Sequence, residues 1–404
     1  MKLLMLLPSQ ARGGAEEQSL TIARAAVARG WEVHAGFPAV PGTASLRQDF
    51  AAAGAICHQL AIAEIPTRWR HLADLQRLLR TVAALLTIKP DVVQIALPSP
   101  ISGMGSILAC GLLRVPTAVV FHSTPVRVSF GRRLRAYAWA RARNQQWIAV
   151  SESSRELVCQ SFQTAPDEVL RIYNGAKTRG TDFSLSTLPK QAEVCSTSAR
   201  QSVCQELGFS ETDRLILTVG RLHPDKGYRD LLHTIPHLLA EFPNAKFLWV
   251  GEGEFREQLS NEVKKYGVAD AVRILGHRTD VLRLMQASDL LAFPSHVEAM
   301  SLVLLEAMAA GLPLVASRVG GTPEVVTDQV HGRLCHAGDS CDLLATLRWA
   351  LQHPQQMREM AARASERVRE FSEERMIEET LETLQRLRRG ELGHAEESSL
   401  LFPS

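Results

Sequence analysis

The stretch FPSHVEAMSLVLLEAMAAGLPLVASRVGGTPEVV, residues 293–326, decides the fold of its half of the chain. Its pattern predicts a strand, a loop, a helix, a short buried strand and a glycine-rich turn into another helix. Gly311 is expected to follow the end of the first helix, with Pro313 just beyond it. Thr322 is the expected N-cap of the last helix, and Pro323 its first residue. This alternation of strand and helix is typical of a parallel α/β sheet.

Two glutamates eight positions apart, Glu298 and Glu306, occupy the loop and first helix of this stretch. A helix that begins near Ser301 would direct the N–H groups of Leu302 and Val303 at the Glu298 loop, where they suit a phosphate. The two carboxylates could then accept hydrogen bonds from hydroxyl groups on either side, as a nucleotide sugar requires. The neighbours of Glu306 are apolar, so we expect this carboxylate to be buried. An isolated buried carboxylate is costly, which favours a binding role over a surface role.

Two cations lie in a second glycine-punctuated loop, GRLHPDKG at residues 220–227. This loop follows a predicted strand at residues 214–219. Arg221 and Lys226 together could neutralise a diphosphate and stabilise it as a leaving group. A solvated loop remains the alternative for either residue alone.

The first half of the chain has two further candidate positions. Gly13 and Gly14 follow the buried strand Leu3–Leu7, at the end of the strand where open α/β sheets bind ligands. A plain tight turn is the alternative for this glycine pair. His122 directly follows the strand predicted at residues 117–121 and so occupies a similar place in the sheet, although a lone histidine can also be a core or surface residue.

Strands and helices alternate along almost the whole chain, which predicts an α/β protein with two doubly wound, Rossmann-like domains. The first domain is predicted at residues 1–177 and the second at 206–371. Residues 178–205, rich in Ser and Thr, are the expected linker between them. The helix at about 372–389 is expected to pack back on the first domain. Residues 390–404 are expected to be a disordered tail.

Composition places the chain among soluble globular proteins. It has 404 residues, of which 46% are hydrophobic and 22% charged, with a net charge of +2. Residues 1–175 hold 19 Lys and Arg against 11 Asp and Glu, so the first half is basic and the second acidic. The basic first half favours an anionic partner.

The seven cysteines are scattered without a CxxC pair, which predicts reduced thiols and no metal site. No apolar run is long enough to predict a transmembrane helix, and the start of the chain is predicted to be a strand.

Residues 127–147 combine six arginines with Phe130, Tyr137, Trp139 and Trp147. This stretch could be an interfacial helix on anionic lipid. It could equally be a solvated basic helix whose aromatic side chains pack inward. Earlier in the chain, residues 71–88 have the leucine spacing of an amphipathic helix.

These motifs resemble those of the retaining glycosyltransferases of family 4. The resemblance rests on the Glu298–Glu306 spacing, the GRLHPDKG loop, the GGAE sequence at residues 13–16 and Asn174-Gly175, and it covers essentially the whole chain. It implies the GT-B fold, in which two Rossmann-like domains face each other across a cleft. It also implies transfer of a sugar from a nucleotide-activated donor with retention of configuration, by an enzyme of class EC 2.4 that uses no metal and no cofactor.

The resemblance also implies roles for single residues. Glu298 would contact hydroxyl groups of the donor sugar and Glu306 the ribose of the nucleotide. Arg221 and Lys226 would bind the phosphates, Gly14 would lie close to donor and acceptor, and His122 would lie near the reacting sugar. A UDP-sugar is the favoured donor, with a GDP-sugar as the alternative.

The chain departs from the family pattern at two places. Ala299-Met300-Ser301 stands where many members have Gly-Phe-Gly, and Ser123 stands where many have an acidic residue after the histidine. The donor sugar and the acceptor are therefore left open.

We expect a cytoplasmic, membrane-associated enzyme of polysaccharide or lipopolysaccharide biosynthesis that acts on a glycan or lipid-linked acceptor. No role in nucleic-acid binding is expected. The alternatives are a catalytically silent sugar-nucleotide-binding protein, a sugar-nucleotide epimerase and a phosphorylase. A nicotinamide-dependent dehydrogenase is disfavoured because Gly251-x-Gly253 lacks the third glycine of its motif.

Overall fold

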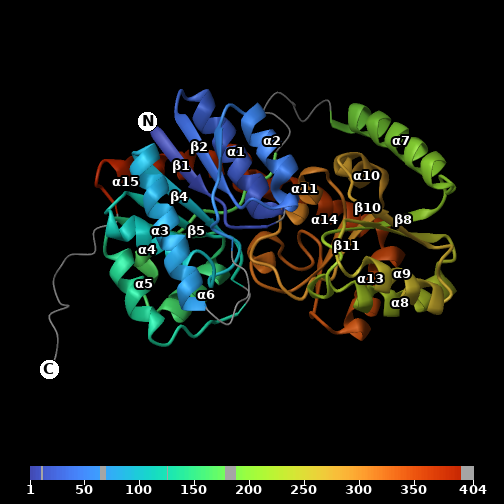
Figure 1. Cartoon of the computed structure of the whole chain (residues 1–404). Helices are drawn as coiled ribbons and strands as arrows, with labels where there is room; N and C mark the ends of the chain where they lie inside the picture. The colour runs from blue at the N-terminus through green and yellow to red at the C-terminus, as the bar shows by residue number, and fades with distance from the viewer. Residues whose placement is uncertain (11, 64–69, 125, 178–187, 393–404) are drawn as a thin grey trace. The chain divides into compact units, whose positions relative to one another are not determined.

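The computed structural model describes residues 1–10, 12–63, 70–124, 126–177 and 188–392 (Figure 1). The chain forms two compact units. Unit 1 combines Met1–Asn174 with Glu374–Ser404, and unit 2 is Gly175–Glu373. Each unit has a parallel sheet and a hydrophobic core of its own. The predicted pair of doubly wound α/β units is therefore confirmed.

Unit 1 is built on a seven-stranded sheet with the order β3-β2-β1-β4-β5-β6-β7. All of its strand pairs are parallel. The strands are β1 Lys2–Leu6, β2 Glu32–Phe37, β3 Ile56–Gln59, β4 Val92–Leu97, β5 Thr117–Phe121, β6 Gln145–Ala149 and β7 Val169–Arg171. Apart from Lys2, every residue of β1, β4 and β5 is buried, as expected for parallel strands covered on both faces.

The helices of unit 1 connect these strands in sequence order. They are α1 Gly14–Ala28, α2 Ala44–Ala52, α3 Arg70–Ile88, α4 Met104–Leu112, α5 Arg133–Arg141 and α6 Glu152–Phe162, with short 3-10 turns at Pro41–Thr43 and Pro166–Glu168. Ser151 caps α6, because its side chain accepts a hydrogen bond from the Ser154 N–H. The last helix, α15 Glu373–Arg388, also belongs to this unit. There Gln18 of α1 donates to the Met376 sulfur, and Leu381, Leu384 and Leu387 are fully buried.

Unit 2 is built on a six-stranded sheet with the order β10-β9-β8-β11-β12-β13, and again all of its strand pairs are parallel. The strands are β8 Arg214–Val219, β9 Ala245–Val250, β10 Val272–Gly276, β11 Leu290–Phe293, β12 Leu314–Ser317 and β13 Arg333–Cys335. The strand order reverses between β8 and β11, which lie side by side. Loops at such a reversal form the ligand-binding edge of open α/β sheets.

The helices of unit 2 are α7 Leu188–Leu207, α8 Tyr228–Glu241, α9 Arg256–Lys265, α10 Val281–Ala287, α11 Leu302–Ala309, α12 Thr322–Val325, α13 Ser340–Gln352 and α14 Pro354–Arg367, with 3-10 turns η3 Pro224–Lys226 and η4 Val368–Phe371. Two boundaries differ from the prediction. Thr322 is the first residue of α12 and Gly321 the N-cap. Most of α7 falls in the range predicted as a linker, and the helix ends two residues beyond it. It is held by ion pairs from Glu206 to Arg278 and Arg283. These partners lie far away in the sequence, so local composition does not reveal them.

The chain passes from unit 1 to unit 2 at Gly175 and returns beside it. The Ala176 N–H donates to the Phe371 carbonyl at 3.0 Å, and the Glu373 N–H donates to the Ala176 carbonyl at 2.9 Å. A Cβ atom on Gly175 would lie 2.5 Å from the Ser372 carbonyl oxygen. A glycine is therefore required at this crossing. The predicted tail at residues 390–404 lies outside the described residues from position 393 onward.

Most aromatic side chains of residues 127–147 pack inward. Trp147 lies in β6, and the rings of Phe130, Tyr137, Trp147 and Phe162 contact one another. Trp139 is different, because it is 38% exposed and the Arg143 guanidinium lies 4.1 Å from its ring centroid. The inward-packing alternative therefore holds for part of the stretch, and an exposed basic and aromatic surface remains.

Within the described part of the chain, no helix is long and apolar enough to cross a membrane. Among the same residues, no group of three His, Cys, Asp or Glu side chains could hold a metal ion. Six cysteines are described with free thiols (Cys57, Cys110, Cys159, Cys204, Cys335 and Cys341).

Candidate functional site: a phosphate and sugar site in unit 2

The loop after β8 brings Lys226 against the loop after β11. The Lys226 ammonium donates to Glu298 Oε1 at 2.5 Å, and the two side chains are only 19% and 10% exposed. Gly227 makes this approach feasible. Its φ is +67°, and a Cβ atom there would lie 1.9 Å from the Pro294 carbonyl oxygen. The cation and carboxylate predicted from separate motifs therefore meet at the reversal point of the sheet.

Gly320 fixes the backbone of Glu298 from the other side. Its φ is +48°, and a Cβ atom there would lie 1.6 Å from the Glu298 carbonyl oxygen. The Gly321 N–H also donates to the Ala299 carbonyl at 3.0 Å. The Gly-rich turn before α12 is thus packed directly on the loop that carries Glu298. No larger residue fits at position 320 without moving this loop.

Helix α11 begins beside this pair. Ser301 is its N-cap, and the Ser301 hydroxyl accepts a hydrogen bond from the Leu304 N–H at 3.4 Å. The helix start predicted near Ser301 is confirmed. The N–H groups of Leu302 and Val303 fall in the first turn, where helix geometry provides no carbonyl partner. Together with Lys226 they offer N–H donors and positive charge to an anion.

Glu306 corrects one expectation. Glu306 is exposed, whereas its neighbours in the helix are buried: Leu304, Leu305, Ala307 and Met308. The helix has only eight residues and packs against α14 and the η4 turn, so apolar neighbours in sequence do not enclose every position. The burial argument for Glu306 is therefore wrong, and its predicted role now depends on the spacing from Glu298 alone.

Arg221 lies in the same loop as Lys226 but is not held by the protein in the same way. Its side chain is 63% exposed, and its guanidinium is 3.9 Å from the Asp225 carboxylate. Such an exposed contact contributes little to stability. The side chain can therefore reorient toward an incoming anion at small cost.

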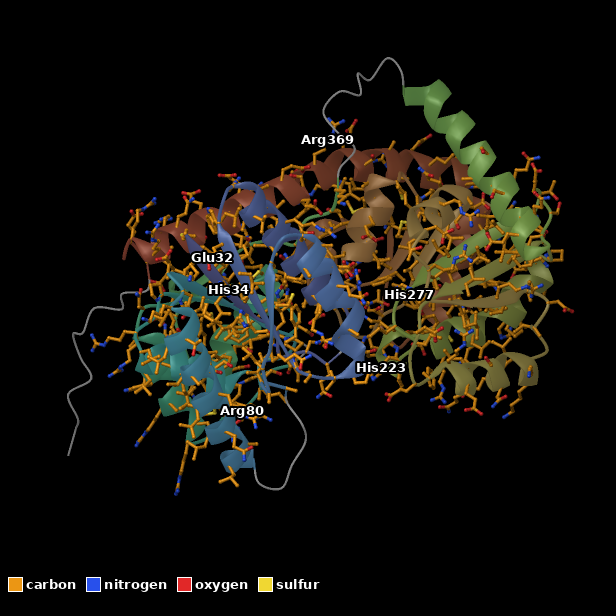
Figure 2. All side chains as sticks on the ribbon, turned by 45° about the horizontal axis from the view of Figure 1, so that its top comes forward. Glu32, His34, Arg80, His223, His277 and Arg369 are labelled. Carbon is orange, nitrogen blue, oxygen red and sulfur yellow. The ribbon has the colours of Figure 1, made fainter. Side chains whose placement is uncertain are left out.

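Asp225 was not predicted as a site residue, yet it connects the two loops. Its carboxylate lies 2.5 Å from His223 Nδ1, and its carbonyl accepts a hydrogen bond from the His296 N–H at 2.7 Å. His223 is marked in Figure 2. The sequence shows a proline-containing turn around Asp225, but it does not show that the turn reaches the β11 loop. Asp225 thus positions the loop that carries Lys226.

Gly14 and His122 belong to unit 1. Gly14 is the first residue of α1, after the extended N-cap Gly13. Glu16, two positions further on, is 3% exposed, and burial raises its pKa although it hydrogen-bonds with Ser9 and with the Gly13 backbone. The Glu16 carboxyl group thus stabilises the turn at Gly13 through hydrogen bonds inside unit 1. It was not predicted as a site residue, although the GGAE sequence contains it.

His122 directly follows β5, as predicted. Its N–H donates to the Leu97 carbonyl at 3.0 Å, which fixes the backbone against β4. Its Nε2 atom is buried without a hydrogen-bond partner among the described residues. Burial lowers the pKa of His122 to about 4, so the ring is neutral at pH 7. An unpartnered buried nitrogen of this kind is suited to receive a ligand group.

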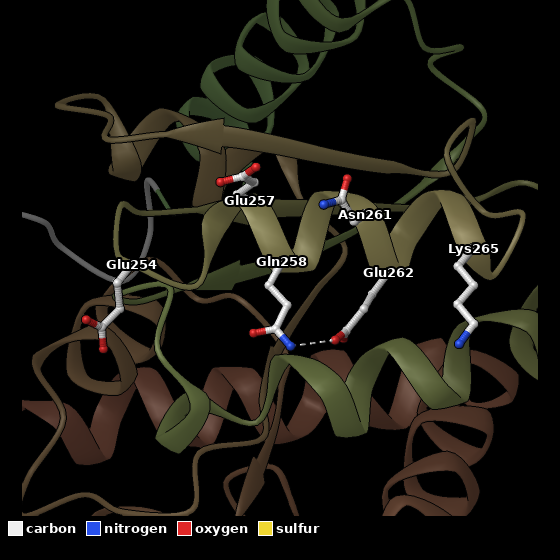
Figure 3. A pocket seen from close by; sticks show the side chains of 6 residues that line it. All are labelled: Glu254, Glu257, Gln258, Asn261, Glu262 and Lys265. Carbon is white, nitrogen blue, oxygen red and sulfur yellow. Dashed lines mark hydrogen bonds between the residues drawn. The ribbon is translucent and has the colours of Figure 1, made fainter.

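A surface pocket lies elsewhere on unit 2 (Figure 3). It is lined by Glu254, Glu257, Gln258, Asn261, Glu262 and Lys265, mostly from α9. Within it Gln258 donates to Glu262 at 3.2 Å. None of these residues belongs to the predicted site. Three carboxylates against one lysine make this pocket unsuitable for a diphosphate.

The two sheets and the site at the strand reversal define a protein of the GT-B fold. Residues 12–179 match the family described as Glycosyltransferase Family 4, and residues 200–370 match that described as Glycosyl transferases group 1. The chain therefore belongs to the family 4 glycosyltransferases, as its motifs suggested.

Individual relatives agree with this placement. An uncharacterized glycosyltransferase of Methanocaldococcus jannaschii is 38% identical over 189 residues, which are 46% of each chain. The glycogen synthase of Mycobacterium tuberculosis is 34% identical over 250 residues, or 61% of this chain and 55% of that protein. The matched segments thus span about half the length of these relatives. The crystal structure of Anabaena Alr3699/HepE in complex with UDP-glucose superposes with a TM-score of 0.76 at 23% identity, covering 95% of this chain and 99% of that one. At that identity it shows the fold.

Proposed function

We propose that this protein is a retaining glycosyltransferase that moves a sugar from a nucleoside-diphosphate sugar to a glycan or lipid-linked acceptor. A UDP-sugar is the favoured donor, and a GDP-sugar is the alternative. The observation on which this rests most is the Lys226–Glu298 pair at the start of α11, inside a single unit. Membership of the family and the UDP-glucose bound by a protein of the same fold support it.

The Lys226–Glu298 pair acts as a preformed switch in this proposal. In the absence of donor each group neutralises the other. A bound diphosphate offers Lys226 a more highly charged partner, and Arg221 turns toward the same phosphates. Glu298 is then free to accept hydrogen bonds from hydroxyl groups of the donor sugar. Glu306, two turns along α11, would accept from the ribose.

In this proposal the protein's own side chains and backbone N–H groups stabilise the charge that develops in the reaction. The acceptor oxygen forms a bond to the anomeric carbon while the bond from that carbon to the phosphate oxygen breaks. The departing phosphate oxygen takes the acceptor proton, on the same face of the sugar, so configuration is retained. Lys226, Arg221 and the N–H groups of Leu302 and Val303 stabilise the developing charge on the diphosphate. Gly14 and a neutral His122 are proposed to act near the reacting sugar.

The acceptor class is proposed from charge. The first half of the chain carries an excess of basic residues, which favours an anionic or membrane-borne acceptor. We therefore propose a role in cell-surface polysaccharide or lipopolysaccharide synthesis, with peripheral contact at the inner face of the cell membrane.

A donor-cleavage assay tests the proposal without knowledge of the acceptor. The protein is incubated with UDP- and GDP-sugars, and the released sugar is followed by proton NMR with water as acceptor. We expect one donor to be cleaved, with release of the α-anomer from an α-linked donor before mutarotation. Release of the β-anomer would contradict retention. Tight binding of a donor that is never cleaved, with water or with any glycan or lipid acceptor, would favour the silent binding protein. Conversion of the sugar while still linked to the nucleotide would favour the epimerase.

A further inference from the structure

Helix α3 of unit 1 has an exposed stripe of leucines. Leu72, Leu75, Leu79 and Leu86 are 57%, 50%, 57% and 59% exposed. At about 100° per residue they lie within an arc of roughly 60° on the helix surface. Leu85, on another side of the helix, is buried in the core. The leucine spacing that predicts an amphipathic helix therefore contains two apolar faces, and only one of them is used by the fold.

The stripe belongs to a continuous layer of three helices. Gly105 of α4 lies so close to α3 that a Cβ atom there would be 2.7 Å from the Arg77 Cβ. Gly111 of α4 approaches Ala140 of α5 in the same manner, at 3.1 Å. Asp74 of α3 also forms an ion pair of 2.7 Å with Arg133 of α5. Helices α3, α4 and α5 therefore pack closely side by side, and we call them the α3–α5 layer.

The α3–α5 layer is strongly basic. Residues 70–147 contain eleven Lys and Arg but only two acidic residues, Asp74 and Asp91. Both carboxylates are engaged, since Asp74 pairs with Arg77 and Arg133 and Asp91 accepts a hydrogen bond from the Lys2 backbone N–H. Six of the cations are exposed: Arg80 (marked on α3 in Figure 2), Lys89, Arg114, Arg127, Arg132 and Arg135.

Further exposed apolar groups lie among these cations. Leu112 at the end of α4 is 55% exposed, and Val126 before α5 is 60% exposed. Trp139 of α5 is partly exposed beneath the Arg143 guanidinium. Tryptophan and arginine side chains of this kind favour the boundary between water and lipid, because each has an apolar body and a polar end.

We propose that the α3–α5 layer docks on an anionic lipid bilayer, with the leucine stripe of α3 inserted among the acyl chains and the arginines on the headgroups. A stripe of leucines flanked by cations is the pattern of an interfacial helix. A second copy of this chain is a poorer occupant. Two such layers would bring like charges together, and the two carboxylates of residues 70–147, Asp74 and Asp91, are already engaged within the chain.

This lipid-docking surface specifies the membrane contact of the proposed function, and its biological role rests on that function. The layer would hold unit 1 at the surface where a lipid-linked acceptor resides. Lipid binding can be measured without donor or acceptor. Its failure and the failure of the glycosyltransferase assignment are therefore separate results.

The test is co-sedimentation of the full chain with vesicles. One set contains phosphatidylglycerol and phosphatidylcholine, and the other phosphatidylcholine alone. The wild type is expected to bind the anionic vesicles and to dissociate as salt is raised. Leu75→Gln/Leu79→Gln should weaken this binding about tenfold or more, whereas Leu282→Gln, at an equally exposed leucine of α10 in unit 2, should have no effect.

A second pair of double variants tests whether binding requires the positive charge of the α3–α5 layer. Arg132→Glu/Arg135→Glu should abolish binding to anionic vesicles, and Lys264→Glu/Arg369→Glu, at exposed positions of unit 2, should preserve it. Figure 2 marks Arg369. Melting temperatures report folding of all four variants. Absence of wild-type binding at low salt would overturn the proposal. A dimer in light scattering that Leu75→Gln/Leu79→Gln dissociates would also overturn it, in favour of a second copy.

Discussion

At the scale of single residues, Lys226 is the cation on which the proposed donor site depends. Its ammonium is 2.5 Å from Glu298, in a mostly buried position. Lys226→Ala removes charge that stabilises the leaving diphosphate, so donor cleavage is expected to fall roughly 10²–10³-fold. Lys264→Ala, an exposed lysine of α9, is the control and should retain the wild-type rate. The measurement is the rate of nucleoside diphosphate release, and a Lys226→Ala rate within twofold of wild type would refute this role.

His122 predicts a dependence of stability on pH. Its folded-state pKa is lowered to about 4 by burial, below an ordinary value of about 6.5. Between these values the unfolded state binds a proton that the folded state does not, so stability is lost as pH falls from about 6.5 toward 4. The loss from this residue is at most about 3 kcal/mol.

A comparison of His122→Gln with the wild type isolates this contribution. Urea unfolding at pH 7 and at pH 5 should show a smaller loss of stability in the variant, because glutamine does not titrate. His277, an exposed histidine of unit 2, provides a control through His277→Gln. Equal losses in wild type and His122→Gln would show that this histidine titrates normally.

At the scale of elements, the turn between β12 and α12 determines where Glu298 lies. Gly320→Ala would place a Cβ atom 1.6 Å from the Glu298 carbonyl oxygen, so the β11 loop must move. Gly338→Ala is a matched control, since Gly338 also has a positive φ, of +73°, but its Cβ would meet open space. The control should lose about 1 kcal/mol from backbone strain. Gly320→Ala should lose more and should also weaken nucleotide binding. Equal stability and equal binding in the two variants would contradict this packing.

The sequence predicts most elements because hydrophobic periodicity and turn residues report local structure. The strands Thr117–Phe121 and Arg214–Val219 have the predicted bounds. Prediction from the sequence fails where contacts with residues distant in the chain determine the structure. Helix α7 is fixed by Arg278 and Arg283, which are more than seventy positions from Glu206. Glu306 is exposed because of how α11 packs against α14 and the η4 turn. The leucines of α3 do not reveal which of their two faces meets the core.

At the scale of the whole molecule, two separate cores predict two responses to perturbation. Leu384 of α15 is fully buried in unit 1, so Leu384→Ala should destabilise that unit by about 2–5 kcal/mol. The proposed donor site lies in unit 2, so a bound nucleotide should stabilise the core of that unit. Calorimetry should show one transition lowered by Leu384→Ala and another raised by nucleotide. Arg388→Ala, at an exposed position near the end of the same helix, should leave the first transition unchanged.

A single unfolding transition that both perturbations shift equally would contradict this independence.

The candidate site itself was predictable to the extent that it lies within one unit. Glu298, Ser301 and Lys226 come from short motifs, and the strand order alone brings the β8 and β11 loops together. Asp225 and Glu16 were missed because their importance depends on contacts that no local pattern contains.

The most direct test of the central claim is a thermal-shift titration with UDP, GDP, ADP and CMP. We predict that one of them stabilises the wild type, by about 2.7 kcal/mol at a hundredfold excess over its dissociation constant. Lys226→Ala and Glu306→Ala should each weaken this effect, and Lys264→Ala should not. If none of the four nucleotides stabilises the wild type, unit 2 does not contain the donor site described here.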